Sequence, residues 1–65
     1  MKLKVIRAMK DVSQYDLNLR TGIPQSKISL FERGYLKPNK NEKTAIAKAL
    51  NVNVDELEWR VLENG

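Results

Sequence analysis

Residues 14 to 33 have the pattern of two short helices joined by a tight turn at Gly22. Ser13 precedes Asp16 by three residues, a spacing at which a hydroxyl caps a starting helix and a carboxylate reaches back to the cap. Gly22 can leave that helix at positive φ, which costs other residues about 1 kcal/mol or more. Pro24 fixes φ and lacks an N–H, which suits the start of the next helix. The chain must therefore fold around two closely spaced helices.

Three further segments have helical patterns. Leu3 and Ile6, with Val5 and Met9 on an adjoining strip, make the N-terminal segment amphipathic. The Ser13 capping pattern recurs further along the chain, where Asn39 precedes Glu42 and Asn53 precedes Glu56. The sequence thus predicts an all-α, compact domain of five helices, over residues 2–11, 14–21, 25–33, 40–50 and 54–62.

The composition removes several classes of function. With 65 residues the chain is one domain, and it contains no histidine and no cysteine. The common zinc sites and the Ser-His or Cys-His nucleophile pairs are therefore absent. No phosphate-binding loop is visible either, so we expect no metal, no cofactor and no enzymatic activity. No apolar run approaches the roughly 20 residues of a membrane span, and the N-terminus lacks a signal-peptide core. We expect a cytoplasmic protein that does not associate with membranes.

Charge is distributed unevenly along the chain. Residues 1–48 hold eleven lysines and arginines against four carboxylates, a net charge of +7, whereas residues 49–65 carry −3. A polyanion would be attracted to the basic part and repelled from the C-terminal end. A solvated lysine-rich surface is the alternative interpretation of the same charges.

The predicted helix over residues 25–33 has the side chains of a nucleic-acid reader. Ile28 and Phe31 are spaced to face the core, which leaves Gln25, Ser26, Ser29, Leu30 and Arg33 on the other sides. Gln25, Ser26 and Lys27 lie on its first turn, and such groups reach base edges and phosphates. A helix of this kind, braced by a second helix, fits the major groove of DNA.

One set of residues carries a resemblance to a known family. It consists of Ser13, Gln14, Leu17, Gly22, Ile23, Gln25, Ser26, Ile28, Ser29, Glu32 and Gly34. This pattern resembles the Cro and repressor-type helix-turn-helix family, also called XRE. Pro38 and the run IAKALNVNVDEL, residues 46–57, resemble the fourth helix and the start of the fifth in that family. The resemblance covers residues 3–57 and implies a lambda-repressor-like DNA-binding domain, with the helix-turn-helix at the second and third helices.

The resemblance implies two sets of DNA contacts. The base-reading set is Gln25, Ser26, Ser29 and Leu30. Gln25 would supply most of the direct discrimination, about 1–3 kcal/mol against a wrong base. The phosphate-contacting set is Gln14, Lys27, Arg33, Lys37 and Lys40.

The resemblance also implies structural roles. Arg7 and Glu32 occupy positions that form an ion pair between the first and third helices in related domains. Asn18 stands where the family usually has alanine. Its amide must find a partner if it is buried. Either a nearby carbonyl satisfies it or the angle between the two helices differs, which would change the register of Gln25 over the bases.

We expect a sequence-specific, double-stranded DNA-binding transcriptional regulator, and a repressor because the chain is short. Because one domain buries little DNA surface, we also expect a homodimer on DNA, with Trp59 and Leu62 as candidate dimer contacts. For Trp59 the favoured interpretation is a lid over the core, and the dimer contact is its main competitor. No small-molecule effector is evident. A protein-binding adaptor or antitoxin-like module, or the N-terminal headpiece of a longer regulator, are the alternative functions.

Overall fold

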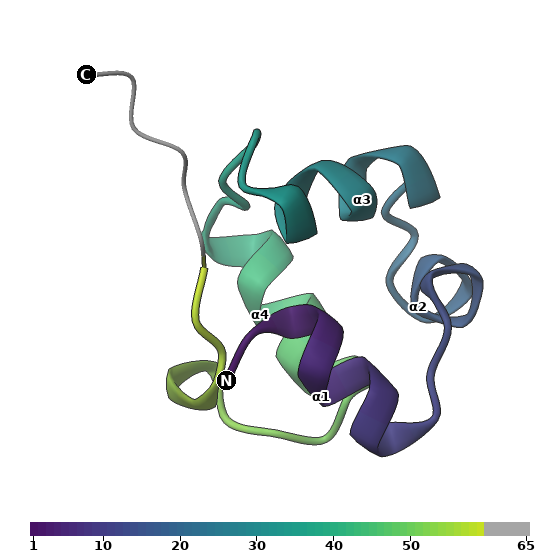
Figure 1. Ribbon diagram of the computed structural model, residues 1–65, viewed down its shortest axis with the longest axis vertical. Coiled ribbons are helices and arrows are strands. Elements are labelled where there is room, and N and C mark those ends of the chain that lie inside the picture. Colours follow the sequence, from purple (N-terminus) through teal and green to yellow (C-terminus); the bar gives the residue numbers. More distant parts are fainter. Residues whose placement is uncertain (60–65) are drawn as a thin grey trace.

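The fold consists of four α-helices followed by one 3-10 turn. The computed structural model describes residues 1–59. The elements are α1 (Leu3–Lys10), α2 (Gln14–Thr21), α3 (Gln25–Arg33), α4 (Lys40–Ala49) and the 3-10 turn η1 (Val54–Glu56). Figure 1 shows these elements gathered around one centre, with the N-terminus beside the segment that contains η1. The four predicted α-helices therefore form, each within one residue of the expected bounds.

The helix boundaries follow from local capping. The Ser13 hydroxyl accepts a hydrogen bond from Asp16 N at 2.9 Å, and Asn39 Oδ1 accepts one from Glu42 N at 2.8 Å. In both cases the carboxylate accepts the amide N–H of the cap residue in return. Such reciprocal bonds satisfy amides that have no partner inside the helix. The starts of α2 and α4 are therefore set by residues three positions apart.

The core is a single apolar cluster to which every helix contributes. α2 packs against both α3 and α4, and α1 covers the cluster with Leu3 and Ile6. The largest side chains that are fully buried are Phe31, Leu17, Ile28, Ile46 and Leu50. Val5 and Met9, the adjoining strip of α1, are exposed instead. The α2–α3 pair is thus supported from behind by α1 and α4.

The prediction of a fifth α-helix over residues 54–62 is wrong for the part that the structure describes. Only Val54–Glu56 is helical, and it forms a 3-10 turn. Leu57 then adopts extended geometry, with φ −94° and ψ 127°. Glu58 N donates to Met1 O at 2.8 Å, and Lys2 and Glu58 form a parallel bridge. The backbone therefore pairs with the start of the chain instead of continuing a helix, and residues 60–62 of the prediction lie outside the described residues.

Candidate nucleic-acid interface

The turn between α2 and α3 is built from backbone geometry and two side chains. Gly22 has φ 77°, and its N–H donates to Asn18 O at 2.8 Å. A Cβ at Gly22 would meet no atom within 4 Å, so the backbone conformation alone favours glycine here. The Thr21 hydroxyl donates to Leu17 O at 2.7 Å and accepts from Ile23 N at 3.1 Å. These bonds determine the direction in which the chain enters α3.

Asn18 finds a partner across the same turn. Its Nδ2 donates to Ile23 O at 2.6 Å, and the side chain is half-buried. The amide is therefore satisfied by a nearby carbonyl, which is one of the two outcomes that the sequence left open. Because the bond joins α2 to the residue just before Pro24, it restrains the position at which α3 begins.

The residues expected to read bases lie along α3 at different degrees of exposure. Gln25 and Ser26, on the first turn, are exposed, whereas Ser29 and Leu30 are half-buried. Ile28 and Phe31 are buried in the core, as the spacing predicted. The first turn is therefore the most accessible part of the predicted base-reading set.

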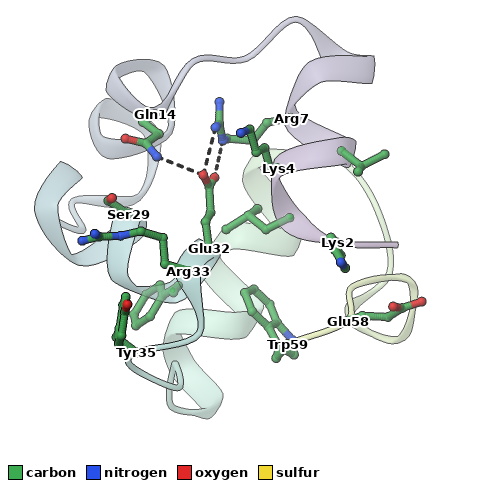
Figure 2. Close-up of a pocket in the computed structure, with 13 residues that line it drawn as sticks. Lys2, Lys4, Arg7, Gln14, Ser29, Glu32, Arg33, Tyr35, Glu58 and Trp59 are labelled. Atoms are coloured by element: carbon green, nitrogen blue, oxygen red, sulfur yellow. Dashed lines mark hydrogen bonds and ion pairs between the residues drawn. The ribbon is translucent and has the colours of Figure 1, made fainter. Parts of the chain in front are cut away.

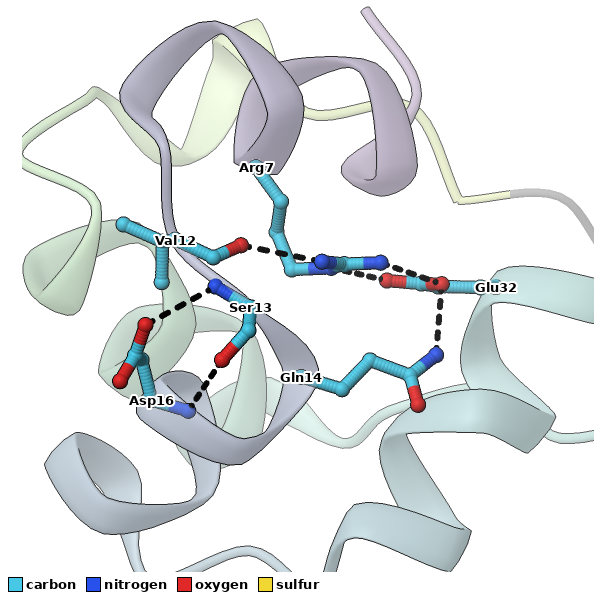
Figure 3. Close-up of polar contacts among 6 residues, drawn as sticks. All are labelled: Arg7, Val12, Ser13, Gln14, Asp16 and Glu32. Carbon is cyan, nitrogen blue, oxygen red and sulfur yellow. Dashed lines mark hydrogen bonds and ion pairs between the residues drawn. The ribbon is translucent and has the colours of Figure 1, made fainter.

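A polar network holds the other side of α3 against α1 and α2. Arg7 Nε donates to Glu32 Oε2 at 2.5 Å and Arg7 Nη2 donates to Oε1 at 3.1 Å (Figure 3). Arg7 Nη1 also donates to Val12 O at 3.0 Å. The two side chains are 13% and 6% exposed, so this is a shielded, bidentate ion pair. It joins α1 to α3 at the positions that the resemblance indicated.

Gln14 belongs to the same network. Its Nε2 donates to Glu32 Oε1 at 2.9 Å, so the side chain of this expected phosphate contact is oriented by a carboxylate (Figure 3). A glutamine amide has a second N–H and an acceptor oxygen. The bond to Glu32 therefore orients Gln14 and leaves hydrogen-bonding capacity for a ligand.

Lys27 makes a contact that the sequence did not reveal. Its Nζ lies 2.6 Å from Glu42 Oε2, which joins the first turn of α3 to the first turn of α4. This ion pair, and after it the N–H of Asn39, lower the pKa of Glu42 below its ordinary value of 4.5. The Lys27 side chain is still 40% exposed. An ammonium has three N–H donors, so a second partner can share it.

The cations at the end of α3 and beyond it are accessible. The Arg33 guanidinium lies over the Tyr35 ring, 5.2 Å from its centroid, a cation–π distance. Lys37 and Lys40 are exposed in the α3–α4 connection and at the start of α4. Within residues 1–59 none of these three side chains forms a salt bridge.

The comparison with protein families agrees with this geometry. The helix-turn-helix family model matches residues 3–57. The chain belongs to the Cro/C1-type helix-turn-helix family, also called XRE. No curated protein and no solved structure matches it. The matched range contains α2 and α3, the two helices that the turn at Gly22 joins.

Other features of this helix-turn-helix domain bear on its chemistry. No group of three or more potential metal-ligating side chains lies within residues 1–59. No helix in the same range is long and apolar enough to cross a membrane. Trp59 is half-buried against the core, and its Nε1 is buried with no hydrogen-bond partner among residues 1–59. The packing of Trp59 agrees with the interpretation as a lid, whereas Leu62, the other candidate dimer contact, lies outside the described residues.

Sequence reasoning missed three partners in this interface, namely Glu32 for Gln14, Glu42 for Lys27 and Tyr35 for Arg33. Opposite charge was a sequence signal for Lys27 and Glu42 alone, and it does not specify a pair among residues distant along the chain. The Arg33–Tyr35 contact, two residues apart at a helix end, depends on the turn at Gly34, where φ is 81°.

Proposed function

We propose that this domain binds double-stranded DNA sequence-specifically and regulates transcription, with α3 in the major groove. The observation that carries the proposal is the exposure of Gln25 and Ser26 on the first turn of α3. The turn is restrained by the Asn18–Ile23 hydrogen bond, and the far end of α3 by the Arg7–Glu32 pair. Exposed amide and hydroxyl groups on a rigid helix can meet base edges at a defined register.

Base reading is assigned to four residues of α3. Gln25 can bond bidentately to adenine N6 and N7, and Ser26 can bond to several bases. Ser29 and Leu30, half-buried, stand farther along the helix, where Leu30 can contact a thymine methyl group. Gln25 therefore carries the main discrimination in this proposal.

Phosphate contacts are assigned to groups around α3. Gln14 presents the amide atoms that Glu32 leaves unused, and Lys27 is shared between Glu42 and the backbone of the DNA. Arg33, Lys37 and Lys40 contribute accessible positive charge. These contacts position the domain without reading sequence.

We further propose that the domain acts as a homodimer and as a repressor. Two copies of α3 placed about 34 Å apart would meet successive major grooves of a palindromic site. Repression requires only that the protein occupies a site, so DNA contacts alone are sufficient for it. A mass measurement of the DNA complex tests the dimer, and one copy of the chain on a palindromic duplex would exclude it.

Selection from a randomised duplex library tests the base-reading proposal directly. We expect a half-site or palindromic motif, and we expect Gln25→Ala to lose preference at one or two base positions. The same variant should retain the salt dependence of wild type, because Gln25 contacts no phosphate in the proposal. Binding without any motif, fading equally for both proteins as salt rises, would reject sequence-specific recognition.

One observation favours a second candidate function, a protein-binding adaptor or antitoxin-like module. Tyr15 and Leu19 are four residues apart on α2 and are 59% and 64% exposed. Residues at this spacing lie next to each other on one helix face. An apolar pair of this kind suits a protein contact, and this function would gain support if the library selection gave no motif.

A further inference from the structure

A groove runs between the start of α1 and the end of α3. Its volume is about 630 Å³, and Lys2 and Lys4 line one side while Arg33 and Tyr35 line the other. Figure 2 shows these side chains on opposite sides of the groove, with Glu32 and Trp59 between them. The groove is therefore bordered by cations that come from two different helices.

The carboxylates in this groove are engaged by other groups. Glu32 is paired with Arg7, and Glu58 Oε1 lies 3.3 Å from the ammonium of Met1. Within residues 1–59, Lys2, Lys4 and Arg33 form no salt bridge. Among residues 1–59, therefore, no carboxylate in contact with Lys2, Lys4 or Arg33 neutralises the charge that these side chains bring to the groove. A polyanion is the ligand that such a surface attracts.

The groove adjoins the proposed base-reading surface. Gln14 and Ser29 line it together with Arg33, and all three belong to the proposed DNA contacts. A phosphate strand that leaves Gln14 can therefore continue along the groove towards Lys4 and Lys2. Continuity with the helix-turn-helix distinguishes Lys2 and Lys4 from Lys10 and Lys48, which do not line the groove.

The backbone that carries Lys2 is held in place. Lys2 bridges Glu58, Lys2 O accepts from Ile6 N at 3.0 Å, and Met1 O accepts from Glu58 N. The extended segment after η1 therefore fixes the start of α1. The first turn of α1 contains no acidic residue, although carboxylates are favoured at the positive end of a helix dipole. Lysines occupy the segment in their place.

We propose that this groove receives the DNA phosphate backbone beyond the helix-turn-helix, with Lys2 and Lys4 of the α1 start as additional phosphate contacts. The inference rests on the proposed function and extends it, because neither lysine belongs to the contacts assigned above. It also assigns a role to the segment after η1, which positions Lys2 for the DNA.

Salt titration of DNA binding tests this assignment. The variant is Lys2→Gln/Lys4→Gln, and the matched control is Lys10→Gln/Lys48→Gln, which removes the same charge from exposed positions outside the groove. The slope of log K against log salt changes by about 0.9 for each phosphate that the protein ceases to neutralise. We expect the slope of the groove variant to fall by about 1.8. The control should keep the wild-type slope, and both should keep the wild-type base preference.

A third variant tests the same groove in the opposite direction. Glu58→Gln removes a negative charge from the edge of the groove. The variant should therefore bind duplex DNA more tightly than wild type at low salt. Equal slopes for the groove variant and its control, or unchanged affinity of Glu58→Gln, would overturn the assignment. Circular dichroism melting of each variant checks that the fold is retained.

The outcome can be separated from that of the proposed function. The slopes are measured on any duplex, whereas sequence-specific recognition is judged by the selected motif. A clear motif with equal slopes would reject only the groove. No motif, with a reduced slope for the groove variant alone, would reject only sequence-specific recognition.

Discussion

The Glu32 carboxylate accepts hydrogen bonds from two other helices, from Arg7 on α1 and from Gln14 on α2. A carboxylate that is 6% exposed is strongly disfavoured unless it is paired, because burial removes its hydration. Glu32 therefore orients Gln14, a proposed phosphate contact, while its ion pair with Arg7 joins α1 to α3. One residue links the stability of the domain to the geometry of the interface.

Arg7→Ala should destabilise the domain strongly. The variant leaves the shielded Glu32 carboxylate without its cation, and breaking a buried pair typically costs about 3–5 kcal/mol. Urea unfolding followed by circular dichroism measures the loss, with Arg33→Ala, an exposed arginine, as the control. A loss for Arg7→Ala no larger than that of the control would contradict the shielded ion pair.

Local capping explains how the individual helices start, and it also marks where prediction from sequence fails. Ser13–Asp16 and Asn39–Glu42 form reciprocal bonds, so their helices begin where the residues indicate. Asn53 and Glu56 have the same spacing, and Asn53 N does donate to Glu56 Oε2 at 2.7 Å. The helix still stops there, because the next residues pair with Met1 and Lys2. A short-range pattern cannot report a competing partner more than 50 residues away in sequence.

The two capping boxes predict a loss of stability in acid. The N–H and the hydroxyl of Ser13 lower the pKa of Asp16 below its ordinary value of 3.8, and Lys27, then Asn39, lower the pKa of Glu42 below 4.5. A carboxylate whose pKa is lower in the folded state stabilises that state above its ordinary pKa, and this contribution is lost as pH falls through the folded pKa. We expect the thermal midpoint to fall as pH drops below about 4.5.

Glu42→Gln provides the test of this pH dependence. Glutamine keeps a capping oxygen but cannot ionise or form an ion pair with Lys27. The variant should be less stable than wild type at pH 7, and the difference between the two midpoints should shrink as the pH is lowered towards 3. A difference that stays constant over this range would show that the charge of Glu42 does not contribute.

At the scale of the molecule, the sequence predicts the all-helical class and the helix-turn-helix core because both depend on local spacing. Ile28 and Phe31 face inwards and Gln25 and Ser26 face outwards, as helical periodicity requires. The ion pair of Lys27 and the bond between Gln14 and Glu32 depend on how helices are placed relative to one another. The groove between α1 and α3 likewise depends on the pairing of Lys2 with Glu58, two residues that are far apart along the chain.

Leu57 is a core residue because the segment after η1 pairs with the start of the chain. Leu57 is 5% exposed and belongs to the same apolar cluster as the helices, whereas nearby Val54 is 38% exposed. Leu57→Ala should therefore lower the free energy of unfolding by about 2–5 kcal/mol, the usual range for a buried leucine. Val54→Ala, measured in the same urea titration, should change it by less than about 0.5 kcal/mol.

Because Leu57 adjoins the residue that bridges Lys2, the Leu57→Ala substitution should also loosen the start of α1, and hydrogen exchange at Glu58 N should quicken. Similar small losses for both variants, with unchanged exchange, would mean that the segment after η1 contributes little to the fold.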